Sequence, residues 1–113
     1  MMNELTNNAI QLLQDLIKIE SYSFNENKTG NRIEKWFKFH DIEFKRNQNN
    51  VYAFNKFYDS NKPTILLNSH HDTVKPNKGY KNDPFYSKIE NGKLYGLGSN
   101  DAGGALVSLI AVF

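Results

Sequence analysis

The sequence of 113 residues contains no cysteine, and this absence removes two classes of site. A disulfide scaffold is excluded, and so is a metal site built on thiolates. Histidine, aspartate and glutamate are therefore the only side chains left to hold an ion. No internal repeat and no low-complexity linker interrupts the chain.

The chain also lacks an excess of charge of either sign. Its 14 basic and 12 acidic residues are spread along the sequence and leave a formal charge of +2, so no basic footprint for nucleic acid or an anionic membrane emerges. The lysines of residues 75–81 are interpreted as part of a solvated loop. The longest apolar run is too short to cross a bilayer, and the first ten residues lack the basic start and apolar stretch of a leader. We therefore expect a cytoplasmic protein without nucleic-acid or membrane partners.

What is present is enough apolar material for one ordinary packed domain. Hydrophobic residues make up 39% of the chain and aromatic residues 13%. Apolar positions at helical spacing predict an amphipathic helix over about residues 5–19 and a second helix that ends near residue 40. Asn25 and Asn27 are its candidate caps. His40 is interpreted as a packing or capping residue, and four aromatic residues are assigned to the core: Trp36, Phe37, Phe44 and Phe54.

Further along the chain the apolar period changes towards two, which predicts strands. Residues 42–44 and 51–57 read as paired strands around a turn at residues 47–50. The apolar run 64–68 is typical of a central strand buried on both faces, and Asn91-Gly92 predicts a tight hairpin within residues 87–95. Residues 102–113 are apolar nearly all round, as in a buried helix. Together these elements predict an α/β layered architecture.

The first segment that can carry chemistry is Ser69-His70-His71-Asp72-Thr73, at the end of the predicted central strand. Side chains alternate along a strand, so His70 and Asp72 should share one face while His71 points to the other. An imidazole with a nearby carboxylate is the usual unit of a metal ligand and its orienting partner. The alternative is a strand end with hydrogen-bonded histidines, and structural hydrogen bonding is the preferred interpretation of His71.

The second segment is the glycine-rich run of residues 96–104, which contains Asp101. Its glycines permit tight turns that could aim the Asp101 carboxylate into a cleft at the start of a helix. The alternatives are a simple Asp cap and a phosphate-binding loop. The spacing does not match a dinucleotide fingerprint, and a carboxylate there would repel phosphate. A divalent ion needs histidine and carboxylate ligands from neighbouring strand ends, so the two segments reinforce each other.

Residues 65–76, 83–85 and 91–104, read together, resemble the family of co-catalytic zinc amidohydrolases and peptidases. That family includes acetylornithine deacetylase, succinyl-diaminopimelate desuccinylase, aminoacylase and carboxypeptidase G. The version of the glycine-rich run looks most like the acetylornithine deacetylase branch. Two positions depart from the common pattern, because Leu97 and Gly103 stand where family members commonly have Arg and Lys.

The resemblance implies a role for each matching residue. His70 would ligate one zinc ion, Asp101 would bridge two zinc ions, and Asp72 would be the catalytic-site carboxylate that orients the His70 imidazole. Cobalt is a conceivable substitute for zinc. The implied fold is the N-terminal part of a layered zinc-peptidase-like catalytic domain, with a mixed, mostly parallel sheet flanked by helices.

The implied activity is hydrolysis of an N-acyl amino acid. Acetylornithine, in arginine biosynthesis, is the first choice of substrate. The alternatives are succinyl-diaminopimelate, acetylcitrulline or a dipeptide within the same family, and a catalytically dead binding or assembly domain outside it. A nucleotide-binding module is a more distant alternative. No titratable side chain follows Asp101, so the expected proton-shuttling Glu and remaining ligands are missing. We therefore expect residues 1–113 to be the N-terminal portion of the metal-binding domain, inactive alone, and the full-length protein to be a possible homodimer.

Overall fold

The first helix begins at a side-chain cap. The computed structural model describes residues 3–113, so the first two residues of the stretch considered above for a leader lie outside the described part. The Oδ1 atom of Asn3 accepts a hydrogen bond from the Thr6 backbone N–H at 2.9 Å, which satisfies one of the free donors of helix α1 (Glu4–Ile17). The helix predicted over residues 5–19 is confirmed, and it ends two residues early.

Helix α2 (Asn27–Phe39) ends where the sequence predicts, but its start differs. The prediction of Asn25 or Asn27 as the cap is wrong, because Glu26 occupies the cap position without a side-chain hydrogen bond. The buried hydroxyl of Thr29 lies 2.9 Å from the Glu26 carbonyl oxygen and can donate to it. This bond ties the Thr29 side chain to the first turn, but it satisfies none of the free N–H donors that an asparagine cap would have bound.

The core lies between the three helices, with α3 (Gly104–Val112) packed against α1. Leu12 is fully buried, which contributes about 1.5–3 kcal/mol to stability. Trp36 and Phe37 are buried as predicted, and Phe44 packs against this core. The core prediction is wrong for Phe54, which is 57% exposed. The buried apolar residues that make up this core are Ala9, Leu12, Leu13, Leu16, Ile17, Ile33, Trp36, Phe37 and Val107.

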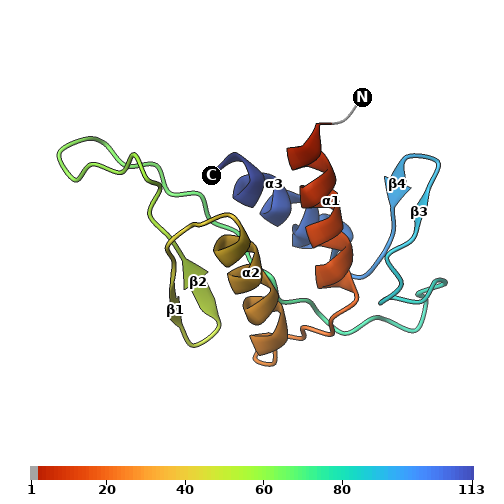
Figure 1. Ribbon diagram of the computed structural model, residues 1–113. Helices are drawn as coiled ribbons and strands as arrows, with labels where there is room; N and C mark the ends of the chain where they lie inside the picture. Colours follow the sequence, from red (N-terminus) through yellow and green to blue (C-terminus); the bar gives the residue numbers. More distant parts are fainter. Residues whose placement is uncertain (1–2) are drawn as a thin grey trace.

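Two antiparallel hairpins lie on opposite sides of the helices (Figure 1). Strands β1 (Lys45–Asn47) and β2 (Asn50–Tyr52) pair around the predicted turn. Strand β1 begins just after the predicted first strand, and β2 overlaps only the start of the predicted second strand. Strands β3 (Ile89–Glu90) and β4 (Lys93–Leu94) pair around Asn91-Gly92, so this predicted hairpin is confirmed. Both turn residues have positive φ, 51° for Asn91 and 75° for Gly92, as the tightest hairpin turn requires.

The predicted central strand is the main difference between sequence and structure. Residues 64–68 form no ladder with any other part of residues 3–113, and Ile65 and Leu66 are 85% and 83% exposed. A strand exists only through hydrogen bonds to a neighbour, and the described residues place none beside this run. The prediction that it is buried on both faces is therefore wrong for this chain, although its composition is that of a strand.

The helix predicted over residues 102–113 forms, but the prediction that it is buried on all sides is wrong. Among the residues of α3 only Val107 is classed as buried, and Val112 is 74% exposed. An apolar pattern indicates how much surface a helix can bury, whereas the neighbours actually present decide how much it does bury.

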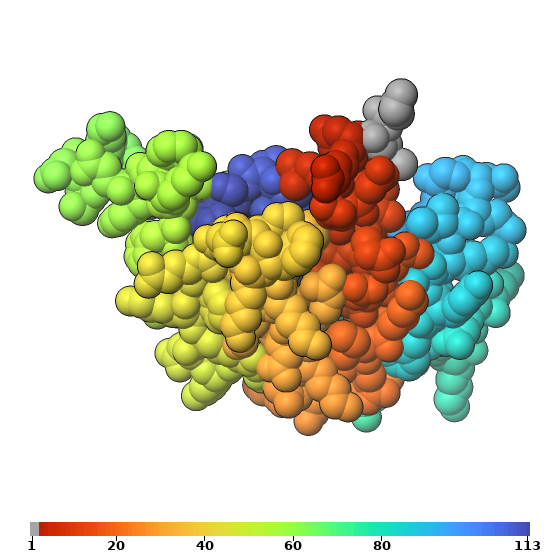
Figure 2. All heavy atoms as spheres, in the orientation of Figure 1, coloured from red at the N-terminus to blue at the C-terminus, as the bar shows by residue number. Residues whose placement is uncertain are grey.

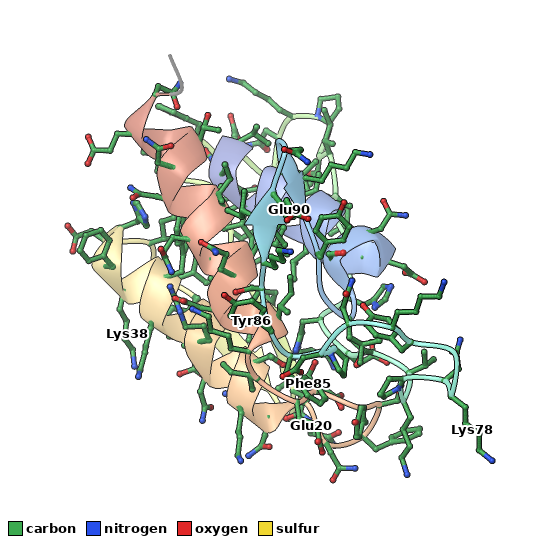
Figure 3. All side chains as sticks on the ribbon, turned by 90° about the vertical axis from the view of Figure 1, so that its right-hand side faces the viewer. Glu20, Lys38, Lys78, Phe85, Tyr86 and Glu90 are labelled. Carbon is green, nitrogen blue, oxygen red and sulfur yellow. The ribbon has the colours of Figure 1, made fainter. Side chains whose placement is uncertain are left out.

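The α/β class predicted from the sequence is confirmed, as three α-helices with two small sheets among the described residues. The described strands form hairpins, and the one parallel pairing is an isolated bridge between Tyr22 and Thr73. Residues around 55–65 project from the body (Figure 2), and Lys78 points away from it, in keeping with a solvated loop (Figure 3). No described helix is long and apolar enough to cross a membrane.

Candidate metal centre

The side chains of His70 and Asp101 lie in contact, although they are 31 residues apart in the chain. The Nε2 atom of His70 is 3.1 Å from Oδ1 of Asp101. The imidazole is 51% exposed and the carboxylate 89% exposed, so both are open to solvent. The structure thus brings together the two residues that the sequence analysis proposed as metal ligands.

Asp72 lies on the other side of the same imidazole. Its Oδ1 atom is 3.1 Å from Nδ1 of His70, and its backbone oxygen is 3.2 Å from the same nitrogen. Both partners of Nδ1 are acceptors when the carboxylate is ionised, so Nδ1 carries a proton. His70 and Asp72 therefore share one face of the segment, as expected for residues i and i+2 of an extended chain.

The segment that carries Asp101 is an irregular turn that leads into α3. The backbone angles of Asp101 (φ −119°, ψ 95°) are not helical; the cap residue of α3 is Gly103, and the Asp101 carboxylate contacts His70 instead. The simple interpretation of Asp101 as a helix cap is therefore wrong. Gly98 begins this turn at φ 78°, and a Cβ atom there would lie only 2.7 Å from Cγ2 of Thr73. The close approach of this turn to residue 73 therefore depends on a glycine.

The electrostatics of the site follow from these contacts. The hydrogen bond donated by the Ser23 hydroxyl holds the pKa of the Asp72 carboxyl below its usual range; burial opposes this effect and the charge of His70 adds to it. Burial alone would lower the pKa of His70. The hydrogen bonds and negative charges of Asp72 and Asp101 outweigh that penalty and raise the pKa of His70 above its ordinary value.

The donor set of His70 and Asp101 suits a cation. With its proton on Nδ1, a neutral His70 points the lone pair of Nε2 at a carboxylate oxygen 3.1 Å away. Two Lewis bases in contact repel each other unless a proton or a cation shares them. The Asp72–His70 pair also has the arrangement in which a carboxylate orients a metal-bound imidazole.

The described residues supply only part of a complete metal site. Among residues 3–113, no group of three or more His, Cys, Asp or Glu side chains could hold an ion together. Structural and catalytic zinc sites take three or four protein ligands. The residues present thus fit one edge of such a site, and further ligands would be needed to close it.

His71 points away from this pair and is held by hydrogen bonds, as the sequence analysis expected. Its Nε2 lies 2.8 Å from the Asn49 carbonyl oxygen, so Nε2 carries a proton. Its Nδ1 lies 2.7 Å from the Thr29 hydroxyl oxygen, whose single proton is shared between this nitrogen and the Glu26 carbonyl oxygen. The ring connects α2 to the β1–β2 turn and fixes the segment on which His70 and Asp72 sit.

Sequence reasoning missed Ser23, which lies in the segment between α1 and α2. Its Oγ atom is 2.5 Å from Oδ2 of Asp72, 49 residues away. A serine in a loop has no periodicity and no spacing motif, so nothing in the sequence distinguishes it from other polar residues. Only the pairing of residues 21–23 with residue 73 reveals its position.

A cleft of about 420 Å³ opens beside residues 66–72, between α2, β2 and α3. Its walls are apolar where Ile33, Phe37 and Ile110 line it. His70 and Asp72 also belong to its lining, whereas Asp101 does not; a separate hollow of about 260 Å³ is lined by His70, Asp72 and Asp101 together. A small molecule with an apolar part and a hydrolysable polar group could therefore approach the His70 imidazole from this side.

Comparison with known proteins agrees with the geometry. Residues 66–113 match the family model described as "Peptidase family M20/M25/M40". This match includes His70, Asp72 and Asp101, and it supports the M20 peptidase family for this chain, as the motifs predict.

Several curated relatives are named succinyl-diaminopimelate desuccinylases. The protein from Blochmanniella floridana is 30% identical over 94% of this chain and 29% of its own length. A probable desuccinylase from Staphylococcus aureus (strain Mu50) is 29% identical over 89% of this chain and 26% of its own. The protein from Acidiphilium cryptum (strain JF-5) is 38% identical over 46% of this chain and 14% of its own.

These comparisons bear on two questions: how much of its relatives this chain covers, and which substrate their names contain. The chain spans less than a third of the length of the curated relatives it matches. The names of these relatives correspond to the alternative substrate in the sequence analysis. The particular closeness to acetylornithine deacetylase is not confirmed.

Proposed function

We propose that this chain belongs to the M20 peptidase family and is the N-terminal portion of the metal-binding domain of a longer hydrolase that cleaves linear amide bonds. The observation that carries the proposal is the contact of His70 Nε2 with Asp101 Oδ1, with Asp72 behind the imidazole. The family match and the desuccinylase relatives support the same class of reaction. The remaining ligands and the general base would come from other parts of the longer protein.

Within this proposal each of the three residues has a distinct task. His70 offers the lone pair of Nε2 to a divalent cation. Asp101 would hold the same cation through the oxygen beside His70, and its carboxylate is 89% exposed, so it would also be accessible to a second ion. Asp72 keeps the proton on Nδ1 and stabilises the positive charge that develops on a metal-bound imidazole.

Zinc is the proposed metal, because imidazole and carboxylate ligands without thiolates suit a hydrolytic zinc site. When bound, a pair of zinc ions supplies Lewis acidity that polarises the amide carbonyl and lowers the pKa of a water molecule. The protein's part is to hold the cation and to admit the substrate. The cleft beside residues 66–72 gives an N-acyl amino acid a partly apolar approach to His70, and the hollow lined by His70, Asp72 and Asp101 is where the cation would be held.

For the substrate we propose the N-succinyl group of succinyl-diaminopimelate first, because that substrate stands in the names of the relatives. Acetylornithine is the second candidate. It rests on the glycine-rich run of residues 96–104, with Leu97 and Gly103 in place of the common Arg and Lys. Both substrates are small N-acylated amino acids, so the chemistry at His70 and Asp101 is the same for either.

The test is hydrolysis of the two substrates by the zinc-loaded full-length protein. We expect turnover of at least one substrate, and we expect its loss in His70→Ala and in Asp101→Ala. His40→Gln is the matched control, because the His40 ring packs beside the Trp36 ring, with centroids 4.2 Å apart, and takes no part in the site. The ratio of the two kcat/KM values identifies the acyl group.

Three results would contradict the proposal. Full activity in both site variants would remove His70 and Asp101 from the reaction. Failure of the full-length protein to take up any divalent cation would favour a binding or assembly domain. Clear turnover by residues 1–113 alone would show that no further ligand is required.

A further inference from the structure

Ser23 is placed against Asp72 by the backbone as well as by its side chain. The Thr73 backbone N–H donates to the Ser21 carbonyl oxygen at 2.8 Å, and the Ser23 N–H donates to the Thr73 carbonyl oxygen at 3.2 Å. These two bonds form the parallel bridge between Tyr22 and Thr73. The position of Ser23 is therefore set by the main chain and does not depend on its own hydroxyl group.

The two oxygens of Asp72 have different partners. Oδ2 lies 2.5 Å from Oγ of Ser23, and Oδ1 lies 3.1 Å from Nδ1 of His70. An ionised carboxylate only accepts, so the serine hydroxyl must donate its single proton to Oδ2. With Oδ2 held in this way, rotation of the carboxylate is restricted and Oδ1 stays directed at the imidazole.

This orientation bears on which nitrogen of His70 carries the proton. Two carboxylates compete for the one proton of a neutral ring, since Asp72 lies at Nδ1 and Asp101 lies at Nε2. A proton on Nε2 would block that nitrogen as a metal ligand. A proton on Nδ1 leaves the Nε2 lone pair facing Asp101.

We propose that Ser23 is a positioning residue whose hydroxyl holds Asp72 so that His70 keeps its proton on Nδ1 and presents Nε2 towards Asp101. The significance of this tautomer for metal binding rests on the proposed function, whereas the tautomer itself does not. A purely structural role for Ser23 would stabilise the loop and leave the ring proton where it is.

The direct test is the tautomer of His70 in the 113-residue chain, which contains only three histidines. Long-range ¹H–¹⁵N correlation with ¹⁵N-labelled histidine distinguishes the two tautomers at a pH where the ring is neutral. We expect the Nδ1–H form in the unsubstituted chain and a measurable population of the Nε2–H form in Ser23→Ala. Ser23→Thr keeps the hydroxyl and should restore the Nδ1–H form, and the exposed Ser60→Ala is the matched control.

A second variant protects the test against a loss of folding in Ser23→Ala. Asp72→Asn removes the carboxylate through which Ser23 would act on the His70 ring, and it leaves the backbone bridge between residues 22 and 73 intact. If Ser23 acts through Asp72, the tautomer shift in Asp72→Asn should be unaffected by adding Ser23→Ala. An unchanged tautomer in Ser23→Ala would overturn the proposal, and so would an equal shift in Ser23→Thr.

Metal affinity separates this proposal from the proposed function. In the full-length protein, Ser23→Ala should weaken zinc binding by about 10-fold, within the range found for partners that orient a ligand, and Ser23→Thr should restore it. Such a partner should change kcat or metal occupancy and leave KM nearly unchanged. Absence of any zinc uptake by the unsubstituted protein would refute the proposed function, while the tautomer measurement would still decide the role of Ser23.

Discussion

Nε2 of His70 lies 3.1 Å from Oδ1 of Asp101, and this contact joins the segment after residue 68 to the turn that begins helix α3. It is the closest structural counterpart of the metal site inferred from the motifs. Everything proposed about catalysis depends on these two side chains and on the carboxylate of Asp72 behind the ring.

Removal of divalent cations should abolish hydrolysis by the full-length protein. His70 and Asp101 hold a cation only together with further ligands, so a strong chelator should compete successfully. We expect activity to return on addition of zinc, with cobalt as a substitute, in proportion to the metal measured in the protein. Undiminished activity in protein shown to be metal-free would contradict this expectation.

The pKa of His70 should fall when either neighbouring carboxylate is neutralised. Asp72 and Asp101 both raise the pKa of the imidazole, against the effect of burial. Asp72→Asn and Asp101→Asn should each lower it in metal-free protein, which an NMR titration of the ring protons measures. Lys78→Ala on the exposed loop should leave it unchanged.

The raised pKa of His70 also determines how the stability of the fold changes with pH. The pKa of His70 is higher in the folded protein than its unfolded value of about 6.5. Its contribution to stability is therefore fully present below about pH 6.5 and is lost as the pH rises through the folded pKa. In metal-free Asp101→Asn that part of the pH dependence should shrink, as followed by urea unfolding at several pH values.

Replacement of Thr29 by valine should destabilise the fold. Thr29 is 1% exposed, and its hydroxyl lies 2.7 Å from Nδ1 of His71, so Thr29→Val leaves this ring nitrogen without its partner. The expected loss is about 1–3 kcal/mol in the free energy of unfolding, measured with urea. Thr64→Val at an exposed position is the isosteric control and should change stability little. Equal effects of the two substitutions would show that His71 is not anchored through Thr29.

Two glycines with positive φ should differ sharply in their tolerance of alanine. Gly92 has φ 75° and open space where the methyl group of an alanine would lie, so Gly92→Ala should cost about 1–2 kcal/mol from the backbone alone. Gly96 has φ 151°, and a Cβ atom there would lie 2.4 Å from Cγ2 of the buried Ile17. Gly96→Ala should therefore cost about 1–3 kcal/mol more. Similar unfolding midpoints for the two variants would contradict this reasoning.

Features controlled by neighbours in the chain could be predicted from the sequence. Apolar spacing identified α1 and α2, and Asn91-Gly92 identified the β3–β4 hairpin, because helix periodicity and turn chemistry act over a few residues. The shared face of His70 and Asp72 followed for the same reason.

Features that depend on distant parts of the chain could not be predicted in this way. Residues 64–68 have the composition of a buried strand, yet a strand requires a partner that composition does not supply. Ser23 carries no sequence signal and acquires meaning only beside Asp72. By itself, then, the sequence determined the helices, the hairpins and the residue types able to hold an ion. The tertiary structure decided that residues 23, 70, 72 and 101 meet, because only packing of α1, α2 and α3 brings loops so far apart in the chain to one place.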